Sequence, residues 1–425
     1  MSQPPTVNPA DLPVPPPITV EQHRDRVLQL VTPLPPEVVS LDNADGRVLA
    51  GDVHAQTAIP PFDNSAMDGY AVRAADVVAA NDTEPVPLRV VGESRAGGSD
   101  LPRCEQGQAV RIMTGAPMVA GADAVVPHEG TDRGHPTVLI RHAVDAGAHV
   151  RRRGEDLQAG DLVVAAGTRL TAMAVAAAAS AGCGALPVLA RPRVGIIATG
   201  DELVEPGGVL PAGSIPDSNS YLVAAAVRAA GGEAVRAGIV GDAPADLVAA
   251  LEQLAPRVDV LVLTGGASVG DHDVVKAVLA AAGVPFGPVL MQPGKPQGAG
   301  RWRDGTPVLA LPGNPVSVAV SVELFVRPLL RRLQGCAEVM RPTEIARASG
   351  WKSPAARRQY IPVTLTVVNG VLEARPSAHR GSGSHLVGSL ARADGLAIVP
   401  EHITEVAQGD HVEVLRWERE VELLA

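Results

Sequence analysis

The stretch from Val258 to Asp273 combines the residue types that an anion and metal site needs. Its first residues are apolar and β-branched, which predicts a buried strand. Gly265 and Gly266 follow, and residues without a Cβ let the backbone turn tightly and approach a ligand. Asp271 and Asp273 then precede a predicted helix. A glycine loop with acidic side chains between a strand and a helix is typical of a ligand site at the carboxyl edge of a parallel sheet, although either aspartate could instead only cap the helix.

Four further loops of the same region carry glycine, polar or charged residues near the ends of predicted elements. They are Thr199–Leu203, Pro216–Ser220, Pro293–Pro296 and Leu311–Ser317. Because the carboxyl ends of parallel strands meet at one edge of a sheet, we expect these loops to converge there. In the last loop Asn314 suits an N-cap and Pro315 the first helical position, so that free N–H groups would point at an anion. Each of these residues taken alone also fits a cap or a turn.

The charged side chains of these loops suggest a phosphate held together with a divalent cation. Lys295 and the backbone N–H groups of the glycines suit phosphate, whereas carboxylates repel it unless a cation lies between them. The carboxylates are those of Glu202, Asp217, Asp271 and Asp273. We therefore expect Mg²⁺ with the phosphate of a nucleotide or a pterin. A Walker loop is excluded because Pro296 follows Lys295, and no dinucleotide fingerprint follows a predicted strand.

The elements that must position these loops follow from hydrophobic spacing. Between residues 193 and 338 strand patterns alternate with helical ones, which predicts a parallel sheet covered on both faces. The predicted strands are 194–198, 234–240, 258–264 and 308–311, and the predicted helices are 221–230, 245–254, 274–282 and 316–333. A first helix is expected after Thr19, which forms a capping box with Gln22. An Ala-rich helix is expected over 171–181.

Two further segments show the short alternating runs of β-rich modules. The first module covers about residues 53–150, and the second follows Arg341. The first contains the polar stretch Pro60–Ala71 and a strand that ends in a turn at Thr114 and Gly115. Polar residues beside small ones are hard to explain as core, although an Asx-rich turn is the alternative. Arg151–Asp156 closes the module, and we interpret its three arginines as partners in interdomain salt bridges.

Composition limits the classes of protein. The chain has 425 residues, of which 46% are hydrophobic and 19% charged, so it can bury several cores. Its net charge of -10 argues against non-specific binding to nucleic acid. Its three cysteines lie far apart and fit neither a disulfide framework nor a zinc site, which favours the reducing cytoplasm. We expect no membrane span, because the Ala-rich stretch is too short and too weakly apolar.

Taken together, these stretches resemble the molybdopterin molybdenumtransferases, the family of MoeA and the gephyrin E domain. The order and spacing agree from about Thr19 to Trp417. The resembling stretches are Phe62–Tyr70, Met113–Pro117, Arg151–Asp156, Thr199–Leu203, Gly265–Asp273, Pro293–Pro296, Leu311–Ser317, Arg357–Tyr360, Ser382–Leu386 and Ala393–Leu396. Two positions depart from the family pattern, since Pro216 stands where Tyr is usual and Ala267 where Val is usual. Neither change removes a charged group.

The resemblance implies a homodimer of four-domain subunits with a multidomain α/β and β architecture. A MogA-like α/β sandwich with a parallel sheet would be joined by a β-rich inserted domain and a C-terminal β-barrel. The implied divisions are a disordered tail at 1–18, domain I split between 19–50 and 151–189, domain II at 51–150, the molybdopterin-binding domain III at 190–338, and domain IV at 339–425. The site would lie between domain III of one subunit and domain II of the other.

The resemblance also implies an Mg²⁺-dependent transferase of molybdenum cofactor biosynthesis. Molybdate would be inserted into adenylylated molybdopterin, with release of AMP. The catalytic residues implied are Asp63, Glu202, Asp217 and Asp273, of which the last three would also hold the metal. The substrate-binding residues would be Thr114, Asp156, Thr199, Gly200, Gly265, Gly266, Ser268, Lys276, Lys295, Pro312, Gly313, Asn314 and Ser317. We expect the two lysines to neutralise the charge of phosphate and molybdate.

Two other functions fit the same resemblance. The gephyrin E domain also clusters receptors, so a non-enzymatic scaffold is one alternative, but a scaffold need not keep the acidic loops. The other is a pterin-binding sensor that binds its ligand and releases no AMP. For the enzyme, the expected protein partners are a molybdopterin adenylyltransferase and molybdoenzymes, with no nucleic acid and no membrane.

Overall fold

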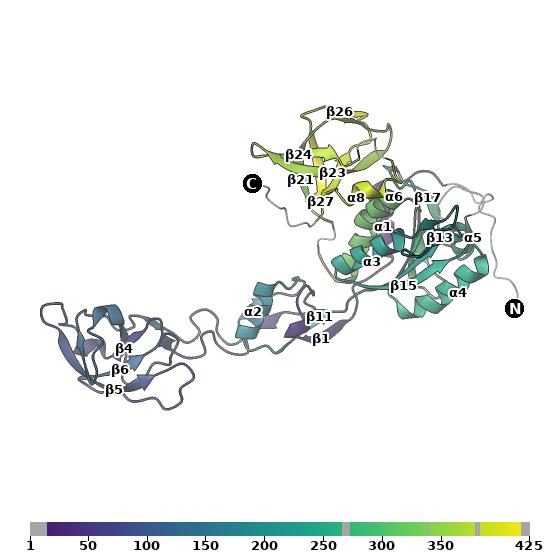
Figure 1. Ribbon diagram of the computed structural model, residues 1–425. Coiled ribbons are helices and arrows are strands. Elements are labelled where there is room, and N and C mark those ends of the chain that lie inside the picture. The colour runs from purple at the N-terminus through teal and green to yellow at the C-terminus, as the bar shows by residue number, and fades with distance from the viewer. Residues whose placement is uncertain (1–14, 266–272, 338–339, 379–382, 418–425) are drawn as a thin grey trace. The chain divides into compact units, whose positions relative to one another are not determined.

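The chain folds into two compact units (Figure 1). A computed structural model describes residues 15–265, 273–337, 340–378 and 383–417. The larger unit comprises Met1–Glu37, Gly46–Ala50 and Val188–Ala425, and the smaller unit comprises Val38–Asp45 and Gly51–Pro187. Each unit has hydrophobic cores of its own. The division into four domains stays a prediction.

The larger unit is built on a six-stranded sheet with the order β15-β12-β16-β20-β19-β17. Its strands are β12 (Arg193–Thr199), β15 (Glu233–Val240), β16 (Val260–Thr264), β17 (Phe286–Pro288), β19 (Pro296–Arg301) and β20 (Pro307–Leu311). The first four strands in the sheet order run parallel, as the alternation of strands and helices predicts. β19 pairs antiparallel with β20, and β17 pairs antiparallel with β19, which the sequence analysis did not predict. Their connections are short, and parallel neighbours need a crossover of a dozen or more residues.

Helices cover both faces of this sheet (Figure 1). One face carries α3 (Asn219–Ala229), α6 (Pro315–Ser321), the π-helical turn η6 (Val322–Val326) and α7 (Arg327–Leu333), and the other carries α4 (Pro244–Leu254) and α5 (Val274–Ala281). Successive strand residues serve opposite cores, because Val260 and Val262 pack on the α3 side and Leu261 and Leu263 on the α4 side. A strand buried on both faces is therefore apolar at every position. The predicted helix 316–333 is interrupted only by the π-helical turn.

The first helix packs into the core on the α3 side. α1 (Val20–Gln29) begins after Thr19, whose hydroxyl accepts a hydrogen bond from the Gln22 N–H at 3.2 Å. Gln22 Oε1 accepts from the Thr19 N–H at 3.0 Å, so the predicted capping box is confirmed. Val20 and Val27 are buried in the cluster that also holds residues of α3 and α7. The helix is thus part of the larger unit, although it lies far from the α/β region in the sequence.

A closed five-stranded barrel completes the larger unit, as expected from the family resemblance. Its strands are β21 (Thr343–Ala348), β23 (Arg358–Val368), β24 (Val371–Pro376), β25 (Gly395–Val399) and β27 (His411–Arg416), and the pairing of β23 with β25 closes the ring. Its interior is filled by small and branched side chains such as Ala346, Val363 and Val414. The short strand β18 (Met291–Gln292) pairs with β23 and thereby links the barrel to the α/β part.

The smaller unit contains a five-stranded sheet with the order β7-β4-β6-β5-β8. Its strands are β4 (Gly69–Val72), β5 (Val86–Ser94), β6 (Gln108–Ile112), β7 (Ala124–Pro127) and β8 (Thr137–Ile140). Tyr70, Leu88 and Ile140 are the large side chains of its core. The predicted Ala-rich helix is α2 (Ala172–Ser180). The five-stranded sheet lies in the segment that the sequence analysis predicted to be β-rich.

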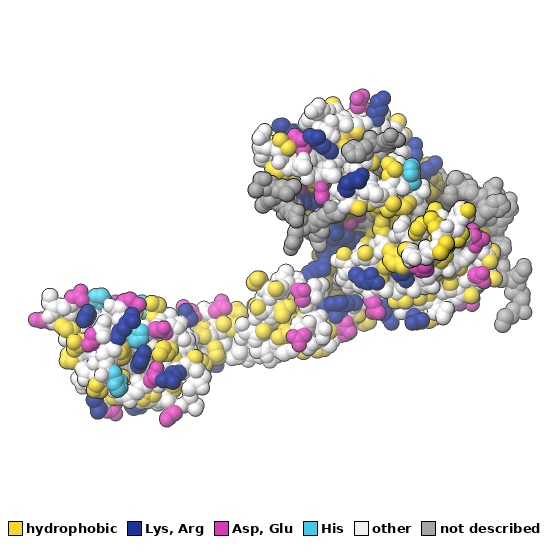
Figure 2. Space-filling view, viewed as in Figure 1, with side chains coloured by type: hydrophobic (Ala, Val, Ile, Leu, Met, Phe, Trp, Pro, Cys, Tyr) yellow, Lys and Arg dark blue, Asp and Glu magenta, His cyan; other side chains and the backbone are white. Residues whose placement is uncertain are grey.

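The remaining elements are short. They are β1 (Pro36–Ser40), β2 (Val53–His54), β3 (Asn64–Ser65), β9 (Val150–Arg151), β10 (Leu162–Val164), β11 (Ala185–Leu189), β13 (Leu203–Val204), β14 (Ile215–Pro216), β22 (Trp351–Lys352), β26 (Glu405–Val406), α8 (Val387–Leu390) and the 3₁₀ turns η2 (Leu41–Asn43), η3 (Ala74–Asp76), η4 (His128–Gly130) and η5 (Ala255–Arg257). Within the described ranges, no helix has both the length and the apolar character to cross a membrane. Figure 2 shows acidic and basic side chains interspersed over the visible face of each unit.

Candidate functional site

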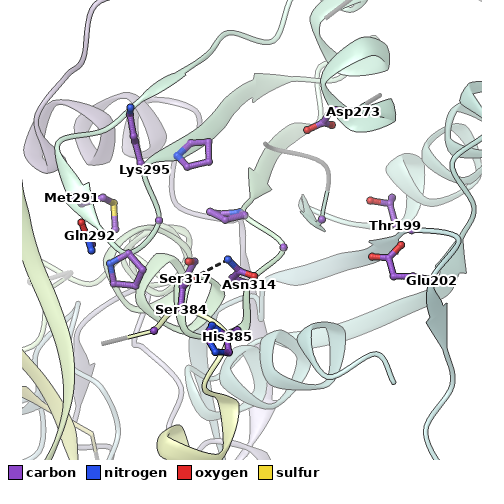
Figure 3. A pocket seen from close by; sticks show the side chains of 18 of the residues that line it. Thr199, Glu202, Asp273, Met291, Gln292, Lys295, Asn314, Ser317, Ser384 and His385 are labelled. Atoms are coloured by element: carbon purple, nitrogen blue, oxygen red, sulfur yellow. Dashed lines mark hydrogen bonds between the residues drawn. The ribbon is translucent and has the colours of Figure 1, made fainter. Parts of the chain in front are cut away.

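A cavity of about 920 Å³ lies in the larger unit at the carboxyl ends of β12, β16 and β20 (Figure 3). Four of the five loops that the sequence analysis grouped together contribute to it, and the other lining residues come from the loop after β15, the start of α5, β18 and the barrel segments. Its lining comprises Thr199, Gly200, Glu202, Asp242, Gly265, Asp273, Val274, Met291, Gln292, Pro293, Gly294, Lys295, Pro296, Pro312, Gly313, Asn314, Ser317, Arg357, Gly383, Ser384 and His385. Ten of the residues expected at the site are among these.

The strand-end loops approach each other so closely that glycine is required. Gly265 has a φ of 96°, and a Cβ at this position would lie 2.6 Å from the carbonyl oxygen of Thr199. Gly200 has a φ of 144°, and a Cβ there would lie 2.5 Å from the carboxylate of Glu202. A side chain at Gly265 would therefore push apart the loops after β12 and β16, whereas one at Gly200 would displace the flexible end of Glu202 in the same loop. The backbones of the two loops form one wall of the cavity.

Carboxylates line one side of the cavity. In Figure 3 Asp273 and Glu202 lie on the same side as Thr199. Asp273 is 7% exposed, and it caps α5 by accepting a hydrogen bond from the Lys276 N–H at 3.0 Å. The capping role considered from the sequence is thus present, and the same residue also lines the cavity. Capping of α5 and a place in the cavity lining are therefore compatible roles for Asp273.

Asp242 is a third carboxylate of the cavity, and the sequence analysis did not name it. Its backbone N–H donates to Asp201 Oδ1 at 3.0 Å, and the Asp201 N–H donates to Asp242 Oδ2 at 3.4 Å. These two bonds hold the loops after β12 and β15 together. Its position just after a predicted strand, at the same sheet edge as the other loops, is the sequence feature that could have identified it as a site residue.

Figure 3 shows Lys295, Ser384 and His385 on the other side of the cavity from Thr199 and Glu202. Lys295 is exposed, and Arg357 also lines the cavity, from a barrel segment. Asn314 Nδ2 donates to Ser384 Oγ at 2.8 Å, which ties the loop after β20 to the segment before α8 (Figure 3). The sequence analysis noted the stretches that contain these barrel residues but assigned them no role. No periodicity of the barrel strands indicates which residues face the α/β part.

Asp217 is not among the cavity-lining residues, and its role as a metal ligand stays a prediction. Its carboxylate is 1% exposed and accepts hydrogen bonds from the N–H of Ser220, at 3.0 Å, and from the Ser220 hydroxyl. Arg236 Nη2 lies 3.6 Å from Asp217 Oδ2. The aspartate therefore fixes the start of α3. The same loop supports the site through Asn219, whose Nδ2 donates to the Gly313 carbonyl at 2.6 Å.

Lys276 lies outside the cavity lining, and three further predicted positions lie outside the described residues. Lys276 is in the first turn of α5, half-buried, and is not part of the cavity lining. Gly266 and Ser268 lie outside the described residues, as does Asp271. The expectations about these residues stay predictions.

Asp63, Thr114 and Asp156 belong to the smaller unit, where backbone hydrogen bonds join their segments. The Ser65 N–H donates to the Ala116 carbonyl at 3.0 Å, and β3 pairs with β9, which begins the 150–156 segment. Asp63 accepts hydrogen bonds from the Arg153 N–H at 2.8 Å and from Arg152 Nη1 at 2.7 Å.

These contacts hold the pKa of Asp63 below its usual range, with the Arg153 N–H as the largest cause. The carboxylate is therefore ionised at neutral pH. Arg152 forms a salt bridge with Asp63 inside the smaller unit, and the interdomain role of the arginine cluster stays a prediction. Asp156 is exposed, and its backbone N–H donates to the Ile59 carbonyl at 3.0 Å.

The oxygen donors of the cavity fit Mg²⁺ that is bound together with a phosphate. Among the described residues, no group of three or more His, Cys, Asp or Glu side chains is placed to hold a metal ion by itself. Mg²⁺ commonly uses one or two carboxylates, several waters and substrate phosphates. Glu202, Asp242 and Asp273 supply carboxylates of this kind without forming a closed cage. The donor set therefore fits the ion.

Comparisons with known proteins agree with this architecture over the whole described chain. The family descriptions "MoeA N-terminal region (domain I and II)", "Probable molybdopterin binding domain" and "MoeA C-terminal region (domain IV)" match residues 18–182, 195–332 and 346–417. The crystal structure of the molybdopterin biosynthesis MoeA protein from Pyrococcus horikoshii superposes with a TM-score of 0.80 at 32% identity, covering 95% of this chain and 100% of that one.

Relatives of known name are similar over nearly their full length. Molybdopterin molybdenumtransferase 2 of Mycobacterium tuberculosis is 43% identical over 405 residues, which covers 93% of this chain and 98% of the relative. Molybdopterin molybdenumtransferase of Nostoc sp. is 39% identical over 389 residues, covering 89% and 88%. The chain therefore belongs to the MoeA family of molybdopterin molybdenumtransferases, which are enzymes of molybdenum cofactor biosynthesis.

Proposed function

We propose that the protein inserts molybdate into adenylylated molybdopterin, releases AMP and requires Mg²⁺. The observation that carries this proposal is one cavity with carboxylates on one side and cationic side chains on the other. A substrate with a phosphate bridge and an incoming oxyanion needs both. The family membership supports the same chemistry.

The acidic side suits the nucleotide phosphates with their metal. Glu202, Asp242 and Asp273 would repel a phosphate, so they favour it only when a divalent ion lies between them. Mg²⁺ bound there would neutralise the phosphoryl oxygens and make AMP a better leaving group. Thr199, at the end of β12, adds a neutral oxygen donor to the same side.

The cationic side suits molybdate, which is a tetrahedral dianion. Lys295 and Arg357 supply positive charge, and Ser317 and Ser384 supply hydroxyl donors. The helical run after Asn314 adds few N–H donors to this region, because Pro315 has no N–H and the Val316 N–H donates to the Ser384 carbonyl at 3.0 Å. Molybdate would therefore bind at the cationic residues, and the phosphate bridge would bind with Mg²⁺ at the carboxylates of the same cavity.

The scaffold and the sensor are the competing functions. A scaffold needs no cavity that is lined by both carboxylates and cationic side chains, and a sensor would bind the ligand without cleaving it.

We further propose a cytoplasmic homodimer in which Asp63, Thr114 and Asp156 of one subunit complete the cavity of the other. The three cysteines lie far apart in the sequence, which fits a reducing compartment. A molybdopterin adenylyltransferase would supply the substrate, and molybdoenzymes would accept the product.

AMP release measured against molybdate concentration tests the proposal. We expect release by the wild type to rise with molybdate and to stop in EDTA. Lys295→Ala should weaken the response to molybdate about tenfold more than it weakens pterin binding, because it removes one charge from the oxyanion side. Lys352→Ala is the matched control, since Lys352 is an exposed lysine outside the cavity lining.

Two outcomes would contradict the proposed reaction. Release that is equally fast in EDTA would show that no divalent ion takes part. Release that is indifferent to molybdate would remove the link between the oxyanion and the phosphoryl bond. Binding of pterin without any AMP release would favour the sensor.

A further inference from the structure

Asp68 holds both hydrogen-bond donors of Thr114. Its Oδ1 accepts from the Thr114 backbone N–H at 2.7 Å and from the Thr114 hydroxyl at 2.9 Å. The backbone of Asp68 is itself fixed, because its carbonyl accepts from the His128 N–H at 3.0 Å. The turn that carries Thr114 is also pinned, because the Gly115 N–H donates to the Ser65 carbonyl at 2.8 Å.

The direction of the hydroxyl bond follows from the chemistry of the two groups. An ionised carboxylate can only accept, so the single hydrogen of the Thr114 hydroxyl must point at Asp68. The two bonds from Thr114, the backbone one first, also lower the pKa of Asp68, which keeps it ionised at neutral pH. Thr114 is exposed, so the remaining lone pairs of its oxygen face solvent or a ligand. The hydroxyl oxygen is left as an acceptor.

We propose that Asp68 is a positioning residue that commits the Thr114 hydroxyl to accept a hydrogen bond from an N–H or O–H donor of the substrate. This inference rests on the proposed function for the assignment of Thr114 to the substrate. Phosphate and molybdate oxygens are acceptors, so they do not meet this hydroxyl. The donor belongs either to the pterin, which carries amino and ring N–H groups, or to the nucleotide.

Four single variants separate this role from a purely structural one. Asp68→Ala removes the acceptor, whereas Asp68→Asn keeps an oxygen that can accept both bonds and removes only the charge. Thr114→Val removes the hydroxyl and keeps the backbone N–H, whereas Thr114→Ser keeps both. Steady-state kcat and KM for the adenylylated substrate are measured for each variant and for the double variant Asp68→Ala with Thr114→Val.

We expect Asp68→Ala and Thr114→Val each to raise KM about tenfold, the usual scale for one oriented hydrogen bond. Asp68→Asn and Thr114→Ser should stay within about threefold of the wild type. The double variant should be no worse than Thr114→Val alone, because Asp68 acts through a hydroxyl that is already absent. If Asp68 only held the turn through the Thr114 N–H, the increase in KM caused by Asp68→Ala would add to the increase caused by Thr114→Val.

Binding of AMP and of molybdopterin, measured separately by calorimetry without turnover, identifies the donor. Thr114→Val should weaken only AMP if the donor lies on the nucleotide, and only molybdopterin if it lies on the pterin. Additive losses in the double variant, Asp68→Asn as harmful as Asp68→Ala, or unchanged binding of both ligands would each overturn the proposal. If the wild type released no AMP, the proposed reaction would fail, while these binding measurements would still decide the role of Asp68.

Discussion

Asp63 and Asp273 are both expected to be catalytic, and the structure holds them in different ways. Asp63 lies on the surface of the smaller unit in an ion pair with Arg152, whose side chain is 58% exposed. Asp273 is nearly buried and caps α5 in the larger unit. Neither is part of an apolar core, so each can lose its charge without opening a cavity. Chemistry and stability can therefore be separated at these two residues.

We predict that Asp63→Asn and Asp273→Asn fold normally and lose at least about a hundredfold in activity, the scale for removing one group that stabilises charge in a reaction. An exposed ion pair contributes below about 1 kcal/mol, and asparagine is as good an N-cap as aspartate. Urea unfolding and AMP release measure the two effects. A large loss of stability with activity per folded molecule unchanged would show that these residues are only structural.

Asp217 shows that residue type and position do not by themselves reveal a role. It lies in a loop next to the site and has the chemistry of a metal ligand. The structure turns its carboxylate toward Ser220 and Arg236, where it is buried and paired. Asp242 has the same side chain and the same kind of place after a strand, but it lines the cavity.

At the scale of elements, α1 carries a titratable group into the core. His23 is 5% exposed and packs edge-on against Phe325 with ring centroids 4.6 Å apart. Burial, with a smaller contribution from the charge of Arg26, lowers the pKa of His23 to about 4 from 6.5. Between these two values the unfolded chain binds a proton that the folded chain does not bind, so stability falls as the pH decreases.

We predict that the wild type loses on the order of 2–3 kcal/mol of unfolding free energy through His23 between pH 6.5 and 4. His23→Leu removes this contribution, so its stability should fall less over the same range. Urea unfolding at pH 7.5, 6, 5 and 4 compares the two proteins, with the exposed His402→Gln as the control. Equal pH dependence of wild type and His23→Leu would contradict a buried neutral histidine.

At the scale of the whole molecule, the candidate residues are distributed over two units. The larger unit builds the cavity, and the smaller unit carries Asp63, Thr114 and Asp156. A symmetric dimer is the common way for one chain to supply two different surfaces to a shared site.

We predict that light scattering gives twice the chain mass of 43.6 kDa. Mixing inactive Asp63→Asn with inactive Asp273→Asn should then restore roughly a quarter of wild-type activity, because random exchange makes half of the dimers mixed and each mixed dimer has one intact site. Mass-tagged subunits verify the exchange. A monomer at micromolar protein, or no recovery after verified exchange, would mean that the site is not shared.

The sequence by itself determined the elements and most of the strand-end loops. Capping at Thr19, apolar runs such as Val260–Leu263 and glycines after strands are local signals, because they depend on contacts within a few residues. Convergence of the loops at one sheet edge also follows, since parallel strands end on the same side. Family resemblance added the barrel and the identity of the chemistry.

Only the tertiary structure decided which side chains meet. Arg357, Ser384 and His385 reach the cavity because β18 pairs with β23, a contact between segments more than sixty residues apart. α1 belongs to the α/β core because Val20 and Val27 find apolar partners there, and Asp217 turns inward because Ser220 and Arg236 of β15 lie beside its carboxylate. These outcomes depend on packing between distant segments, and the spacing of residues along one chain does not encode that packing locally.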